Sequence, residues 1–282
     1  MNPGGGIMYG SIESPAEIKS SENSYTHKSE YNNLFRSSEA CLPCHDFKIR
    51  GVDAEITFTE WKNIPQFGMA GLVSCQECHM PEKANGTHDH RFVGVDIDLS
   101  YLIGESPLHQ AVEDMLESAV DLQFGYSNQV LPDSISYYDT LVIPISIKSL
   151  TAHSLPSGTS FARESWLEIV IEDEDEFILY ESGLVENIEP LDTTDVNLLV
   201  FTTSILDENG EDVNSITEAH RIDNQSLPAF SARFHSYSFQ PINSSTFLII
   251  NVRMLFRSFK PHLLKDQPDL LENLPIFEGK IF

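Results

Sequence analysis

Two short cysteine-containing stretches constrain this chain more than any other feature of its sequence. The first is CLPCH at 41–45 and the second is CQECHMP at 75–81, and together they contain all four cysteines of the 282-residue chain. Each stretch is a pair of cysteines separated by two residues and followed directly by a histidine. The pattern allows three interpretations: a four-cysteine zinc site, redox-active thiol pairs, or covalent attachment of haem c.

The histidine that follows each pair favours haem. Two thiols at this spacing on a short helical turn can bond the two vinyl groups on one edge of a porphyrin, and the next side chain then reaches the iron. A repeated histidine at this position is improbable by chance in a chain with ten histidines. We therefore expect two covalently bound haem c groups. The expected thioether residues are Cys41, Cys44, Cys75 and Cys78, and the expected proximal iron ligands are His45 and His79.

The ligand on the opposite face of each iron decides the function. A second strong ligand suits electron transfer, whereas an open face suits chemistry on a small molecule. Histidines outnumber suitably placed methionines, so we expect histidine on this side. The candidate distal ligands are His27 before the first motif, His90 in the polar loop after the second, and His153 in a turn after a strand-like segment. Their rivals are His88, Met69 and Met115.

The hydrophobic patterning indicates an α+β chain, in which a mostly helical and loop-rich dihaem c-type cytochrome domain precedes an antiparallel β-sandwich. A hydrophobic content of 41% is sufficient for real cores. From residue 136 onward, β-branched and aromatic residues partly alternate between turn signals, which predicts five to seven strands. The predicted parts are a flexible arm at 1–25, the dihaem domain at 26–104, a connecting helix and linker at 105–135, and the β-sandwich at 136–282.

Two local expectations follow from periodicity. Apolar residues at helical spacing predict a helix over 106–125, with Ser106 as its cap and Gly125 at its end. The segment from His27 to Cys41 resembles a helix that leads into the first cysteine motif. The first of these helices would pack between the haem segment and the β-sandwich.

Charge and hydropathy exclude some classes of partner. The 43 acidic residues against 17 basic ones give a net charge of −26, which argues against nucleic acid or an anionic membrane as the partner. We find no apolar run long enough for a transmembrane span and no recognisable secretory signal at the start. Because haem c is normally attached outside the cytoplasm, we nevertheless expect a periplasmic, cell-surface or extracellular location.

The stretch 27–94 resembles the haem-binding region of multihaem cytochromes c of the cytochrome c554-like group. The stretch from 141 onward looks like the β-rich C-terminal domain of such proteins, in particular the loop AHSLPSG at 152–158 and the strand pair at 165–183. The resemblance implies that His90 and His153, and often His27, supply distal ligands. The chain departs from the family in having two haem motifs where relatives often have four or more.

The function expected from these features is electron transfer between redox partners by a dihaem cytochrome with bis-histidine, six-coordinate haems, which is not an enzyme. The partners would be redox proteins, other cytochromes or further copies of the chain, as in a larger complex or an extracellular cytochrome filament. The alternative is a haem enzyme, in which one open-coordinate haem acts on a peroxide or a nitrogen oxide. The sequence favours the first because it supplies histidines in excess.

Overall fold

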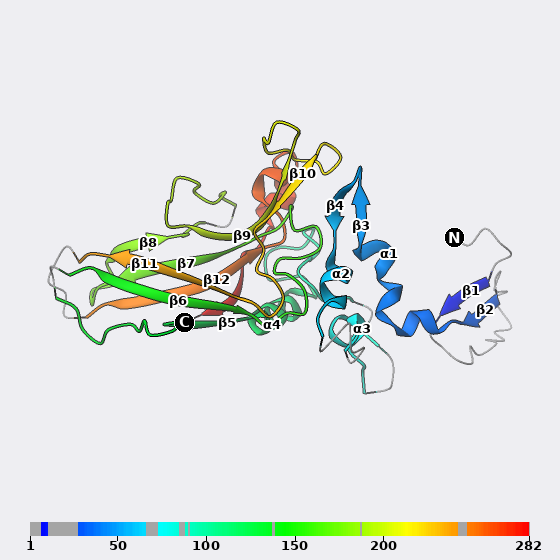
Figure 1. Ribbon diagram of the computed structural model, residues 1–282, viewed down its shortest axis with the longest axis horizontal. Helices are drawn as coiled ribbons and strands as arrows, with labels where there is room; N and C mark the ends of the chain where they lie inside the picture. The colour runs from blue at the N-terminus through cyan, green and yellow to red at the C-terminus, as the bar shows by residue number, and fades with distance from the viewer. Residues whose placement is uncertain are drawn as a thin grey trace.

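The computed structural model describes residues 7–10, 28–65, 73–84, 88–89, 91–136, 139–186, 188–241 and 247–281. Three of the residues considered above, His27, His90 and Met69, lie outside these ranges. The chain is elongated (Figure 1), and its two cysteine-containing helices, α1 and α3, lie beyond one end of a long β-structure. The site therefore has to be assembled where these two parts meet.

The larger sheet has six strands around a central strand β7. Strand β12 pairs with β7 along its whole length, and β8 and β9 share the other edge of β7. All of these pairings are antiparallel, as are those of β9 with β10 and of β12 with β13. The strands are β7 (Glu164–Glu172), β8 (Ile178–Ser182), β9 (Leu199–Leu206), β10 (Arg221–Asn224), β12 (Ile249–Arg257) and β13 (Phe277–Ile281).

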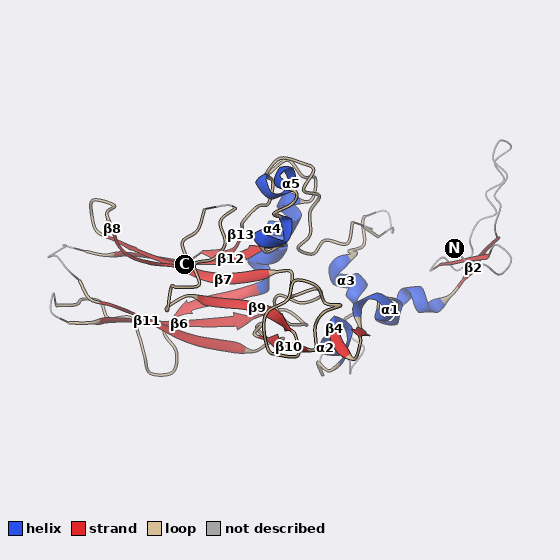
Figure 2. Ribbon diagram, turned by 90° about the horizontal axis from the view of Figure 1, so that it is seen from above, coloured by secondary structure: helices blue, strands red, loops and turns tan. Residues whose placement is uncertain are grey.

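A second, three-stranded antiparallel sheet lies over the first (Figure 2). It consists of β5 (Val120–Phe124), β6 (Leu141–Ser149) and β11 (Ala232–Phe239). Strand β6 turns Ile143, Ile145 and Ile147 into a core that also contains Leu167 and Ile169 of β7. Residues two apart on a strand point to the same face, so alternation of apolar residues places one face of each strand in this core.

The predicted helix over 106–125 is shorter than expected. Helix α4 covers His109–Ala119, and the chain continues directly as strand β5 rather than as helix. The apolar residues Val120 and Leu122 alternate with polar ones, and pairing with β6 satisfies their backbone groups in strand geometry. The side-chain oxygen of Ser106 accepts a hydrogen bond from the backbone N–H of Leu108, just before the helix.

The expected mostly helical character of the chain before the sheets is wrong. Strand accounts for 33% of the structure and helix for 17%. The helices before α4 have four to six residues, and even the approach to Cys41 consists of a strand and two 3₁₀ turns rather than a helix. The elements are β1 (Ile7–Gly10), β2 (Lys28–Tyr31), η1 (Asn33–Arg36), η2 (Ser38–Ala40), α1 (Leu42–His45), β3 (Phe47–Ile49), β4 (Val52–Glu55), α2 (Thr57–Lys62) and α3 (Cys75–His79).

Local sequence explains why these elements stay short. Asn32 caps η1 by accepting the backbone N–H of Leu34, and Pro43 sits in the first turn of α1. Between α1 and α2 the polypeptide forms the β3–β4 hairpin instead of a longer helix. Two further short elements follow β12, namely η3 (Pro261–Leu264) and α5 (Pro268–Glu272). Within the described ranges, no helix is long and apolar enough to cross a lipid bilayer.

Two apolar clusters attach the cysteine-containing part to the sheets. In the first, Val52 of β4 is buried with Ile205 of β9 and Ala219. In the second, Val112 and Leu116 of α4 pack with Phe256 and Phe277 of β12 and β13, and the segment 93–97 packs against them. These clusters hold β4 and the chain after α3 at defined places relative to the larger sheet.

Two neighbouring residues of β6 test which of its side chains face the core between the sheets and which face solvent. Ile143 is fully buried, whereas 44% of the surface of Val142 is exposed. We expect Ile143→Ala to lower the free energy of unfolding by about 2–5 kcal/mol, because it leaves a cavity between the sheets. The control Val142→Ala should cost less than about 1 kcal/mol. Equal losses for both variants in chemical denaturation would contradict the two-layer packing.

Candidate functional site

The two cysteine motifs lie side by side although 29 residues separate them in the sequence. The Cys75 backbone N–H donates to Ser38 Oγ at 3.0 Å, and Gln76 Nε2 donates to the Ser37 carbonyl at 2.7 Å. These bonds fix the start of α3 against η2, the 3₁₀ turn that leads into α1. A capping box formed by Ser74 and Glu77 starts α3 at its first cysteine.

The four thiols form two pairs with unequal exposure. Cys44 and Cys78 are exposed, whereas Cys41 and Cys75 are partly buried and lie in hydrogen-bonding contact with each other. That contact lowers the pKa of Cys75 to about 6 and raises the pKa of Cys41. The first cysteines of the two motifs therefore face each other at the junction of the motifs, and the second cysteines face solvent.

His45 is held by a buried carboxylate. Its Nδ1 lies 2.5 Å from Oε1 of Glu55, the last residue of β4, and only 6% of the Glu55 side chain is exposed. The hydrogen bond raises the pKa of His45, and burial of the ring opposes it. Because β4 is anchored on the larger sheet through Val52, the direction of the His45 ring is set by the β-structure.

His79 is held by a backbone carbonyl. Its Nδ1 lies 2.6 Å from the carbonyl oxygen of Val93. The Val93 side chain packs on the cluster formed by α4, β12 and β13, so this acceptor too is fixed by the β-structure. A ring nitrogen that is fixed by an acceptor orients the imidazole and leaves the other nitrogen, Nε2, to face a ligand or a metal.

His153 lies on a loop between β6 and β7 that α2 holds in place. Glu60 of α2 accepts three hydrogen bonds from this loop, from the Ser154 backbone N–H (3.0 Å), the Ser154 hydroxyl (2.5 Å) and the Ser157 hydroxyl (2.8 Å). Thr57, one turn earlier, accepts the Gly158 backbone N–H at 3.0 Å. A cis peptide bond joins Leu155 to Pro156 in this loop.

Arg163 connects this loop to the segment that holds His79. Its Nη1 donates to the Ser157 carbonyl and to the Thr159 hydroxyl, and its Nη2 forms a 2.6 Å ion pair with Asp96. Gly158 has φ +73°, and a Cβ atom there would lie 2.9 Å from Arg163 Nη1. Glycine is therefore required both by the backbone conformation and by the close approach of the guanidinium.

The two loops bring the rings of His79 and His153 close to each other. Their ring centroids are 6.2 Å apart and their planes differ by 20°. With metal–imidazole bonds of about 2 Å, two rings on opposite sides of one metal ion have centroids about 6 Å apart. In both rings Nδ1 donates a hydrogen bond to a carbonyl oxygen. The acceptor is Val93 for His79 and Ser154, at 3.0 Å, for His153, which leaves Nε2 as the atom available to a metal.

Burial lowers the pKa of His153, with the neighbouring His79 and His45 acting in the same direction. A lowered pKa keeps the ring neutral, and only the neutral ring binds a metal ion. His79 and His153 are 74 positions apart in the sequence, but their rings lie close together in the structure. Among the described residues, no group of three or more acidic, cysteine or histidine side chains is arranged to hold a metal ion. The separation of the two rings thus matches the separation expected for two imidazoles that bind one metal ion.

The other residues considered from the sequence fall into different places. His88 is exposed and its Nδ1 contacts the Met80 carbonyl. Met115 lies on α4. On the same helix, His109 Nε2 lies 3.2 Å from Glu113 Oε1, and the ring packs on Phe277. The remaining candidates, His27, His90 and Met69, lie outside the described residues.

Three residues that matter for this geometry were not expected from the sequence: Glu55, Glu60 and Arg163. In the printed sequence each is one charged residue among many, and their partners lie up to 97 positions away. A usable signal was present for Glu60, because it occupies a short helix whose other face carries the buried Phe58 and Trp61. The centroids of these two rings lie 5.5 Å apart.

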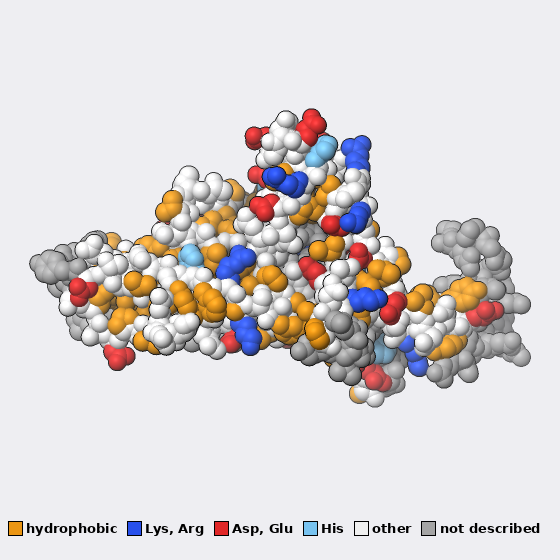
Figure 3. All heavy atoms as spheres, in the orientation of Figure 1, with side chains coloured by type: hydrophobic (Ala, Val, Ile, Leu, Met, Phe, Trp, Pro, Cys, Tyr) orange, Lys and Arg blue, Asp and Glu red, His pale blue; other side chains and the backbone are white. Residues whose placement is uncertain are grey.

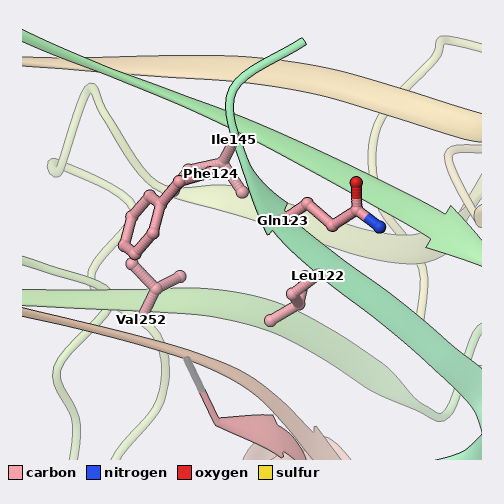
Figure 4. A pocket seen from close by; sticks show the side chains of 5 residues that line it. All are labelled: Leu122, Gln123, Phe124, Ile145 and Val252. Atoms are coloured by element: carbon pink, nitrogen blue, oxygen red, sulfur yellow. The ribbon is translucent and has the colours of Figure 1, made fainter. Parts of the chain in front are cut away.

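A small apolar depression exists elsewhere on the β-structure (Figure 4). Leu122, Gln123, Phe124, Ile145 and Val252 line it between the two sheets. It has no room for a water molecule and carries no titratable side chain, so it is unrelated to the cysteines and histidines.

Comparison with known proteins shows a similar fold. No family model matches the chain, and no curated protein matches it. Among solved structures, a penta-heme cytochrome c552 from Thermochromatium tepidum superposes with a TM-score of 0.63 at 20% sequence identity. The match covers 92% of this chain and 58% of that one, so this chain matches less than two thirds of the cytochrome's length. At this identity the likeness concerns the fold, and it singles out neither the cytochrome c554-like group nor a filament.

Removing the acceptor that holds the His153 loop tests the docking of α2. We expect Glu60→Ala to lower the free energy of unfolding by about 1–3 kcal/mol, because it leaves the Ser154 donors without their partner. Glu117→Ala, on the exposed face of α4, is a matched control and should change stability by less than about 0.5 kcal/mol. Equal stability of the Glu60 variant and the control in urea denaturation would show that these hydrogen bonds contribute little.

Proposed function

We propose that this chain is a dihaem cytochrome c that transfers electrons outside the cytoplasm. The single observation that carries the proposal is the pair of adjacent C-x-x-C-H motifs, one of which ends in His79, opposite His153. When bound, haem supplies a one-electron ferric–ferrous couple. The fold likeness to a multihaem cytochrome is consistent with this assignment.

The described residues fit two haem c groups. Cys41 caps α1 and Cys44 lies within it, and Cys75 and Cys78 belong to α3, so each motif presents two thiols and a histidine on one short helical turn. Each histidine has its Nδ1 fixed by an acceptor, as is usual for metal-binding histidines. We therefore assign the thioether bonds to these four cysteines and the proximal ligands to His45 and His79.

For the opposite face of the haem held by His79, we assign His153. The 6.2 Å separation, the neutral ring and the fixed loop support this assignment. For the haem held by His45, His90 and His27 remain the candidate ligands from the sequence. Two histidines on each iron would exclude substrates from the metal and leave electron transfer as the function, in place of the open-coordinate enzyme.

The proposed partners are other redox proteins, including further cytochromes or copies of this chain. The side chains drawn on the face in Figure 3 include scattered lysines and arginines that form no continuous basic patch on the described atoms. With a net charge of −26, the chain would be attracted to a basic rather than an acidic partner. Because haem c is normally attached outside the cytoplasm, we propose a periplasmic, cell-surface or extracellular location.

Replacing His153 tests both the haem assignment and its ligation. The haem-loaded wild-type chain should contain two haems by the pyridine haemochrome assay, with low-spin spectra that do not respond to carbon monoxide. We expect His153→Ala to convert one of the two haems to a high-spin form that binds carbon monoxide.

The matched control is His220→Ala, since His220 is exposed and its ring contacts only its own turn among the described residues. It should leave the spectrum unchanged. A His153 variant that stays fully low-spin would refute the ligand assignment, and a wild type that binds carbon monoxide would favour the haem enzyme instead.

A further inference from the structure

The two proximal histidines differ in the charge of the group that holds them. His45 Nδ1 meets the Glu55 carboxylate at 2.5 Å, whereas His79 Nδ1 meets the neutral carbonyl of Val93 at 2.6 Å. His153 also meets a neutral carbonyl, that of Ser154. Among these three rings, His45 therefore has an acceptor with a formal negative charge, and the other two do not.

Solvent cannot easily screen this charge. Glu55 has 6% of its side chain exposed and lies at the end of β4, whose Val52 and Ala54 are buried as well. Its Oε1 also accepts, at 3.4 Å, a weak hydrogen bond from Thr57, a residue of the same helix that holds the His153 loop. The position of the carboxylate is thus fixed by the docking of β4 and α2 and does not depend on the ring it contacts.

A cation also lies near Glu55. A Cβ atom at Gly158 would lie 2.9 Å from Arg163 Nη1 and 3.7 Å from Glu55 Oε1. Arg163 forms a 2.6 Å ion pair with Asp96, whereas Glu55 Oε1 contacts the His45 ring directly at 2.5 Å. Because it is in direct contact, the carboxylate has the larger effect on the ring.

An acceptor with a full negative charge draws the Nδ1 proton of an imidazole toward itself and makes the other nitrogen a stronger donor. A stronger donor stabilises the ferric state relative to the ferrous state, because the ferric state carries the higher positive charge. A neutral carbonyl increases the donor strength of the imidazole less and therefore stabilises the ferric state less. The difference in acceptor predicts a difference between the two haem sites.

We propose that Glu55 sets the electron-transfer order of the two haems, by giving the haem held by His45 the lower reduction potential. The first electron would then reside at the haem held by His79 and His153, next to the β-structure, and the haem held by His45 would be the stronger reductant. This inference rests on the proposed dihaem function. It makes Glu55 a positioning residue for the axial ligand.

The test is spectroelectrochemistry of the haem-loaded chain with Glu55→Gln, which keeps the size of the side chain and removes its charge. Two one-electron waves are expected for the wild type. In the variant, the lower of the two reduction potentials should rise by about 59 mV, which corresponds to a tenfold change in the ferric–ferrous equilibrium of that haem. The higher reduction potential should not change. Glu55→Asp keeps the charge but places it farther from the His45 ring, so a smaller rise of the lower potential is expected. This second variant tests the inference if Glu55→Gln does not fold.

The matched control is Asp53→Asn, which removes a charge two residues away on the same strand. Asp53 is half exposed and pairs with the exposed Lys48, so solvent should screen it and neither wave should move. An unmoved lower wave with both Glu55 variants, a shift of the upper wave, or an equal shift with Asp53→Asn would overturn the inference and leave the dihaem function standing. A wild-type chain with no covalently bound haem would overturn both.

Discussion

The arrangement of the site depends on one carboxylate, that of Glu60. It accepts the backbone and side-chain donors of Ser154 and the hydroxyl of Ser157, and so joins helix α2 to the loop that carries His153. Hydrogen bonds to a charged acceptor are among the stronger ones in proteins. Together with the hydrogen bonds of Thr57 and Arg163 to the same loop, this contact sets where the His153 ring lies.

The rest of the site follows from where the β-structure holds its neighbours. Val52 fixes β4, and through it Glu55 and His45, on the larger sheet, while Val93 fixes the carbonyl that orients His79 on the cluster around α4. Arg163 then connects the His79 and His153 segments through Asp96. The sheets therefore act as a frame that orients three histidine rings, and folding of the frame and completion of the proposed haem sites are coupled.

Local patterns in the sequence predicted the helices and strands that are decided by neighbouring residues. The cysteine–histidine spacing identified α1 and α3, and the alternation of apolar residues identified β6 and the β7–β8 hairpin. The helix predicted through 125 failed because pairing with β6 outweighed helical spacing at Val120 and beyond. The partners of Glu55, Glu60 and Arg163 could not be predicted, since each is decided by docking between distant segments rather than by neighbouring residues.

The most direct test of the central claim identifies the iron ligands of the haem-loaded wild-type protein. Near-infrared magnetic circular dichroism of the ferric form separates iron with two imidazole ligands from iron with histidine and methionine and from high-spin iron. If His79 and His153, whose ring centroids lie 6.2 Å apart, bind one iron as proposed, the two-imidazole band is expected. A histidine–methionine or a high-spin spectrum for both haems would contradict it.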